Sequence, residues 1–184
     1  TFTVEPKELA ADAAKVSVTA TVTNTGAAAG KEVVQVYYSA PAGKLDKPYQ
    51  ELAGYAKTKE LAPGESQDVT VTFDTQSMAS YCTECASYVM EAGTYYIRVG
   101  NSSRNTHIAG AVALDETKAV EKVKNICGDS GFEDLKPERN PITYEGEVEE
   151  KENAKTVEIK AADLVVKETV YQEVPAEIPA GPAV

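Results

Sequence analysis

The chain of 184 residues has no tryptophan, one histidine, three cysteines and only three phenylalanines. A hydrophobic core therefore has to be built from valine, alanine, leucine, isoleucine and part of the ten tyrosines. Three cysteines are too few, and odd in number, for the disulfide framework of a small secreted domain. This favours a reducing compartment and, with it, a cytoplasmic location.

Excess positive charge and long hydrophobic runs are also missing. Lys and Arg number 18 against 29 Asp and Glu, which gives a formal net charge of -11. Nucleic acids and anionic membranes are bound through clustered Lys and Arg, so neither is an expected partner. No segment approaches the roughly 20 apolar residues of a membrane-spanning helix, and no signal peptide is visible. Because the chain starts at Thr1 within an alternating pattern, we expect it to be a fragment or a processed form.

The first 115 residues contain short alternating segments that turn residues separate. In residues 15–23 every second side chain is apolar, which predicts a half-buried strand. Seven short strands with turns between them are typical of an antiparallel sandwich. We therefore expect an all-β, seven-stranded antiparallel sandwich over residues 1–115. The predicted strands are 2–5, 15–23, 32–38, 51–59, 67–74, 94–100 and 106–114.

The composition changes after Asp115. Residues 116–127 predict a short helix or one more strand, and a stretch rich in Gly, Pro, Glu and Asn then has the character of a loop. The apolar segments 156–159 and 164–171 could pair as a hairpin, but a lone hairpin is marginal in water. We expect them instead on another part of a longer protein. Residues 116–184 are thus predicted to be an irregular linker or tail, partly extended, that leads to a further domain.

A set of short motifs follows the order known from one protein family. The motifs are NTG at 24–26, GKEVVQVY at 30–37, KLDKP at 44–48, ELAGY at 51–55, LAPGE at 61–65, EAGTY at 91–95 and SSR at 102–104. Together these motifs resemble, over residues 1–114, the fibronectin type III-like domain of glycoside hydrolase family 3 enzymes, which include β-glucosidases.

This resemblance implies an immunoglobulin- or fibronectin type III-like sandwich with a structural role. In the family, the catalytic carboxylates lie on other domains. The resemblance therefore implies no catalytic residue, cofactor site or metal site in this chain, and the chain alone is not expected to be an enzyme. It implies instead an accessory domain that braces the catalytic domains of the same parent chain, a glycosidase of the β-glucosidase type.

The connection between the third and fourth predicted strands carries many apolar side chains. Tyr and apolar residues are enriched at protein interfaces, so this connection is the candidate contact with the catalytic domains. Alternatively, these side chains only cap the sandwich edge, or the chain is a carbohydrate-binding or adhesion module. Direct sugar contact is less favoured because tryptophan, a preferred stacking residue, is absent. The candidate interface residues are Leu45, Lys47, Pro48, Tyr49, Leu52 and Tyr55.

Cys82 and Cys85 form a Cys-x-x-Cys pair, and His107 is the only histidine. A redox pair is favoured at a helix N-terminus, whereas this pair lies between predicted strands. A zinc site needs about four ligands, and only Cys127 and His107 remain to complete one. Free thiols without a role are the favoured interpretation, with a disulfide or a metal site as alternatives. His107 is out of phase with Ile108 and is expected at the surface.

Overall fold

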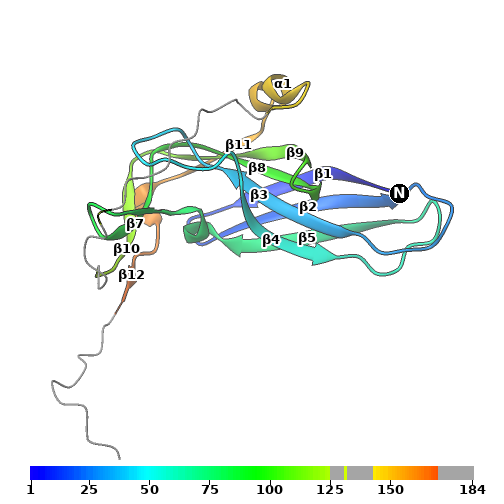
Figure 1. The fold of residues 1–184 in the computed structure, drawn as a ribbon, viewed down its shortest axis with the longest axis horizontal. Helices are drawn as coiled ribbons and strands as arrows, with labels where there is room; N and C mark the ends of the chain where they lie inside the picture. Colours follow the sequence, from blue (N-terminus) through cyan, green and yellow to red (C-terminus); the bar gives the residue numbers. More distant parts are fainter. Residues whose placement is uncertain (125–130, 132–142, 170–184) are drawn as a thin grey trace, which may run out of the picture.

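The computed structural model of the protein describes residues 1–124, 131 and 143–169, which form mainly strands (Figure 1). In this described part, no helix is long and apolar enough to cross a membrane. The helical elements are η1 (Thr75–Met78), α1 (Glu147–Glu152) and η2 (Ala161–Asp163). The strands are β1 (Phe2–Ala11), β2 (Lys15–Asn24), β3 (Val33–Ser39), β4 (Glu51–Lys57), β5 (Ser66–Asp74), β6 (Ser80–Cys82), β7 (Ser87–Met90), β8 (Gly93–Ser102), β9 (Asn105–Leu114), β10 (Lys118–Lys122), β11 (Thr156–Ile159) and β12 (Lys167–Glu168).

The strands that alternation predicts build two facing antiparallel sheets. One sheet has the order β1-β2-β5 and the other contains β4-β3-β8-β9, and Figure 1 shows them as the two layers of a sandwich. The chain passes from one sheet to the other between β2 and β3, between β4 and β5, and again before β8. The prediction of an all-β sandwich with seven principal strands is therefore confirmed.

The core lies between the inner faces of the two sheets. On β2, Val16 and Val18 are at most 1% exposed, and they face a sheet whose β8 buries Ile97 and Val99 completely. Each fully buried aliphatic side chain stabilises the fold by about 1.5–3 kcal/mol relative to an exposed one. Among the described residues, the remaining core is supplied mostly by further valines, by Tyr37, Tyr38 and Tyr95, and by Phe73, as the scarcity of large aromatics predicts.

Two of the sequence motifs meet at one end of the sandwich. Asn24 is fully buried, and its side-chain nitrogen donates to the carbonyl oxygens of Leu61 at 2.8 Å and Ala28 at 2.9 Å. The backbone N–H of Gly64 donates to the Asn24 carbonyl at 2.8 Å. Gly64 has φ of +79°, a left-handed conformation that glycine adopts without a steric penalty. The NTG and LAPGE motifs therefore form one structural unit.

The stretch between β5 and β8 is less irregular than its sequence indicates. β6 and β7 form a hairpin, and β10 and β12 complete a third sheet, of order β12-β10-β7-β6, at one end of the sandwich (Figure 1). The segment 116–127 thus contains a strand, which was one of its two predicted states. The short strands escape prediction because three or four residues are too few to establish an alternating pattern.

The apolar segment 156–159 does not lie apart from the sandwich. It is β11, which pairs in parallel with β9, while β12 pairs with β10, so the two apolar segments do not form a hairpin with each other. Ile159 is 5% exposed and Leu164 is 4% exposed, and both join the hydrophobic core. The expectation of a separate location is wrong because β9 offers an unpaired edge whose N–H and C=O groups β11 satisfies. The domain boundary at residue 115 stays a prediction.

Candidate functional site

The six candidate interface residues lie on the loop between β3 and β4 and on β4 itself. The structure divides them into two groups. The first group, Leu45, Lys47 and Tyr49, is partly buried, and the Lys47 and Tyr49 side chains bind partners within the chain. The second group, Pro48, Leu52 and Tyr55, is exposed.

A buried ion pair fixes the loop. The ammonium group of Lys47 donates to the carboxylate of Glu91, and the two side chains are only 5% and 9% exposed. The same carboxylate accepts the backbone N–H groups of Lys44 at 2.7 Å and Leu45 at 3.3 Å. Burial raises the pKa of Glu91, but the hydrogen bonds from these three residues outweigh it and hold the pKa below its ordinary value. The KLDKP and EAGTY motifs therefore meet in one contact.

Gly43 leaves room where the loop passes over Glu91. A Cβ atom on Gly43 would lie 2.4 Å from the Glu91 carboxylate, closer than Cβ atoms come to other atoms, so a larger residue would displace this carboxylate from its position. The absence of a side chain at Gly43 thus lets the loop backbone approach the carboxylate while Glu91 keeps its present contacts. The position of Leu45 and of the exposed Pro48 thus follows from the Glu91 contact.

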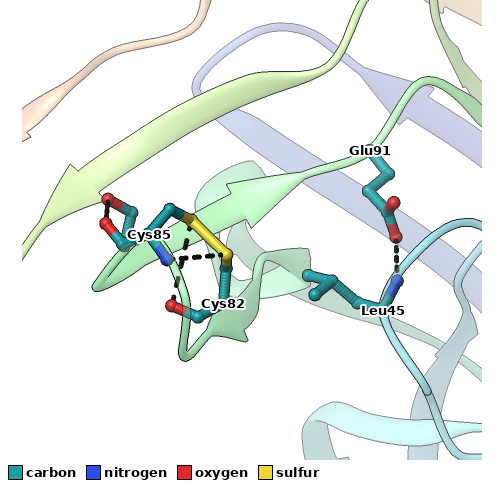
Figure 2. The surroundings of a disulfide bond; sticks show 5 residues. Leu45, Cys82, Cys85 and Glu91 are labelled. Carbon is teal, nitrogen blue, oxygen red and sulfur yellow. Dashed lines mark hydrogen bonds between the residues drawn. A yellow bond between two sulfur atoms is a disulfide. The ribbon is translucent and has the colours of Figure 1, made fainter.

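Cys82 and Cys85 are joined by a disulfide bond at the tip of the β6–β7 hairpin (Figure 2). The interpretation of these residues as free thiols is therefore wrong. The tight turn places their Cα atoms 5.5 Å apart, within the range that a disulfide requires. Figure 2 also shows the Leu45 side chain pointing toward Cys82, while its backbone N–H is bound to Glu91. The β3–β4 loop is therefore bound to Glu91, the residue that directly follows β7 of this hairpin.

Tyr49 belongs to a cluster around Arg98, a residue of β8 that is completely buried. The guanidinium of Arg98 donates to Ser39 Oγ at 2.7 Å and to Glu147 Oε1 at 2.5 Å. Its central carbon lies 4.7 Å from the centre of the Tyr49 ring, and the Tyr49 hydroxyl donates to the same Glu147 oxygen at 2.9 Å. Burial, and then the Glu147 hydrogen bond, raise the pKa of Tyr49 to about 12. Tyr49 is thus an internal contact, and its stacked ring face is not free for a sugar.

The carboxylate in this cluster comes from α1, which lies beyond the predicted sandwich. The Glu147 side chain is 3% exposed and also accepts a bond from Lys151 at 2.9 Å. Sequence reasoning missed both Arg98 and Glu147. Arg98 alternates with the inward-facing Ile97 and Val99, so its position in the strand predicts a solvent-facing side chain. Nothing in the pattern indicates that a later segment covers this face.

The sole histidine also contacts this later segment. His107 Nδ1 lies 2.8 Å from Glu150 Oε1, and the backbone N–H of Ile108 donates to the other Glu150 oxygen at 2.9 Å. The His107 side chain remains 49% exposed, which confirms the expected surface position. Burial raises the pKa of Glu150, but the hydrogen bonds from Ile108, Tyr144 and His107 outweigh this effect and hold the pKa below its ordinary value.

The exposed part of the candidate surface is therefore smaller than predicted. β4 is the outermost strand of its sheet, and it carries Leu52 at 54% exposure and Tyr55 at 71% exposure. Pro48 precedes them on the loop. Among the residues that the structure describes, no group of three or more His, Cys, Asp or Glu side chains is placed to hold a metal ion.

Comparison with known proteins shows which domain family and which proteins the chain is similar to. Residues 32–103 match the model of the fibronectin type III-like domain. The chain is 43% identical over 150 residues to β-glucosidase A of Butyrivibrio fibrisolvens, covering 73% of this chain and 18% of that protein. It is 42% identical over 114 residues to a β-glucosidase of Ruminococcus albus, covering 59% of this chain and 12% of that protein. The chain thus spans less than a fifth of the length of either relative.

Solved structures agree with the sequence matches. β-Glucosidase 3B from Thermotoga neapolitana, in complex with α-D-glucose, superposes with a TM-score of 0.58 at 42% identity over 64% of this chain and 16% of that one. A β-glucosidase from Paenibacillus barengoltzii gives a TM-score of 0.62 at 39% identity over 68% of this chain and 15% of that one. This chain therefore carries a fibronectin type III-like domain of the kind found in the β-glucosidases of glycoside hydrolase family 3.

Proposed function

We propose that the chain is a non-catalytic accessory domain of a family 3 glycosidase of the β-glucosidase type, and that it braces the catalytic domains. The observation that supports this most is the match to β-glucosidase A, which covers 18% of that protein at 43% identity. Most of that relative has no counterpart in this chain. Hydrolysis would then belong to the remainder of a longer protein.

The exposed residues of β4 and the preceding loop are the proposed contact with the catalytic domains. Leu52 and Tyr55 present apolar side chains on an edge strand, and Pro48 extends this surface. Burial of a side chain of this size against a partner contributes about 1.5–3 kcal/mol. The internal anchoring of Lys47 and Tyr49 supports the proposal, because it holds the loop in one position before any partner binds.

The first experiment assays the purified chain of 184 residues with 4-nitrophenyl β-D-glucopyranoside. We expect no release of nitrophenol above the background of a mock purification. Sustained turnover that copurifies with the chain would contradict the non-catalytic role.

The second experiment places Tyr55→Asp in the full-length glycosidase that contains this segment. A buried aspartate without a partner is strongly unfavourable, so we expect faster thermal inactivation of the glycosidase activity. The matched control is Tyr88→Asp, at a tyrosine of the β6–β7 hairpin that is 42% exposed and is not on β4. Equal inactivation rates for the two variants would reject the β4 surface as the contact.

A further inference from the structure

We infer that the outer face of β3, β8 and β9 is a docking surface for the chain's own acidic segment 143–151, which we call the latch. The latch includes the first five residues of α1. This inference rests on the proposed function only for the purpose of the latch, which is to fix the connection between the sandwich and the next part of a longer chain. The docking itself stands on the contacts within this chain.

The burial pattern of α1 shows which kind of side chain this surface binds. Glu147 is 2% exposed, whereas the neighbouring Val148 is 68% exposed. A helix that packs on a hydrophobic surface turns its apolar side chains inward. Here a carboxylate faces the sheet and the valine faces solvent, because the surface offers Arg98, Tyr49 and His107 rather than apolar side chains. The surface therefore fits an acidic partner.

Two carboxylates at the spacing of one helical turn enter this surface. Glu147 and Glu150 are three residues apart, so they lie on the same side of α1. Glu147 binds Arg98 and Tyr49 at one position, and Glu150 binds His107 and the backbone N–H of Ile108 at the other. Two anchored carboxylates fix both the position and the rotation of the helix.

The docking contacts are needed to keep α1 helical. A helix of six residues is unstable alone in water, because the few hydrogen bonds that it can form do not offset the backbone entropy lost in fixing its first turn. Release of the latch would also leave the guanidinium of Arg98 without its carboxylate. Both effects favour the docked state and couple helix formation to docking.

The latch lies directly before β11 and aligns it. Between them, the carbonyl of Lys155 accepts the backbone N–H of Ala111 at 2.9 Å, and β11 continues along β9 from Thr156. A Cβ atom on Gly110 would lie 2.9 Å from this carbonyl, so the approach requires glycine. The latch therefore determines where the later part of the chain meets the sheet, and it acts as a positioning device rather than a flexible linker.

The test compares hydrogen exchange of the whole chain with that of two variants on α1. Glu147→Gln removes the charge that pairs with Arg98, and Glu149→Gln is the matched control on the exposed side of the same helix. We expect the amides of residues 147–159 to exchange about tenfold faster or more in Glu147→Gln, with β2 and β5 unchanged. Glu149→Gln should exchange like the parent chain. Equal exchange in both variants would overturn the latch, as would an equal rise in β2 and β5.

A second variant covers the case in which Glu147→Gln does not fold. Arg98→Met combined with Glu147→Gln removes both charges and leaves no buried charge without a partner. We expect this double variant to fold with fast exchange in α1, and continued protection of α1 would overturn the inference. The readout does not use glycosidase activity, so the latch and the accessory role can fail independently.

Discussion

Replacement of Lys47 by methionine is the sharpest test of how the β3–β4 loop is held. Methionine keeps most of the length and apolar surface of the lysine side chain but removes its charge. The change leaves the Glu91 carboxylate, which is 9% exposed, with the backbone N–H groups of Lys44 and Leu45 as its remaining donors. The variant therefore isolates the contribution of the ammonium group.

The expected loss follows from the burial of the pair. Removing one partner of a buried ion pair costs about 3–5 kcal/mol, because the other charge stays buried. Two backbone donors remain on Glu91, so we expect the lower end, about 3 kcal/mol. The pair Lys59–Glu65 gives the comparison, since its side chains are 62% and 38% exposed. Lys59→Met should cost about 0–1 kcal/mol.

Urea unfolding followed by circular dichroism measures both variants. With a slope of about 1–3 kcal/mol per molar urea, the Lys47→Met midpoint should fall by about 1–3 M. The double variant Lys47→Met with Glu91→Gln should recover part of the loss, because it leaves no unpaired charge. If Lys47→Met shifts the midpoint no more than Lys59→Met, the buried contact does not hold the loop.

The remaining predictions concern pH, the turn glycine and the disulfide. The hydrogen bonds to Glu147 outweigh its burial and lower its pKa from 4.5 to about 2, so its stabilisation is present above pH 4.5 and is lost as the pH falls toward 2. In hydrogen exchange, the free energy of opening of α1 in the parent chain should exceed that in Glu147→Gln by up to about 3 kcal/mol at pH 7, and this difference should shrink at pH 3; a constant difference would contradict the lowered pKa. Gly64→Ala meets no atom within 4 Å, so its loss of about 1–2 kcal/mol in thermal unfolding should come from φ of +79° alone, and an unchanged midpoint would exclude this conformation. Cys82 and Cys85 should react with a thiol reagent only after reduction, as peptide mass spectrometry would show; labelling of both in the unreduced chain would exclude the disulfide.

The principal strands were predictable because their side chains alternate between core and solvent. β2 and β5 show this in the structure, with buried side chains at every second position of their apolar stretches. β1 was predicted too short, because a register shift between Pro6 and Glu8 interrupts its alternation. β6 and β7 have three and four residues, which is too short for a period to be recognised.

The contacts between residues of the site were less predictable than the identity of the residues on the β3–β4 loop. Lys47 and Glu91 both lie in family motifs, but 44 positions separate them and no local pattern pairs them. Arg98 and Glu147 are 49 positions apart, on opposite sides of the predicted domain boundary. Such contacts depend on the arrangement of the strands in three dimensions. Alternation predicts which face of a strand a residue occupies, but not which segment later covers that face.

The parallel pairing of β11 with β9 bears on the tendency of the sandwich to self-associate. A chain cut at residue 115 would keep all seven principal strands, yet it would lose the strand that shields the outer hydrogen-bonding groups of β9. An unprotected edge of this kind is a template for strand addition from a second molecule. A shortened domain would therefore form dimers and larger aggregates through β9, so the region after residue 115 also protects the sandwich against polymerisation.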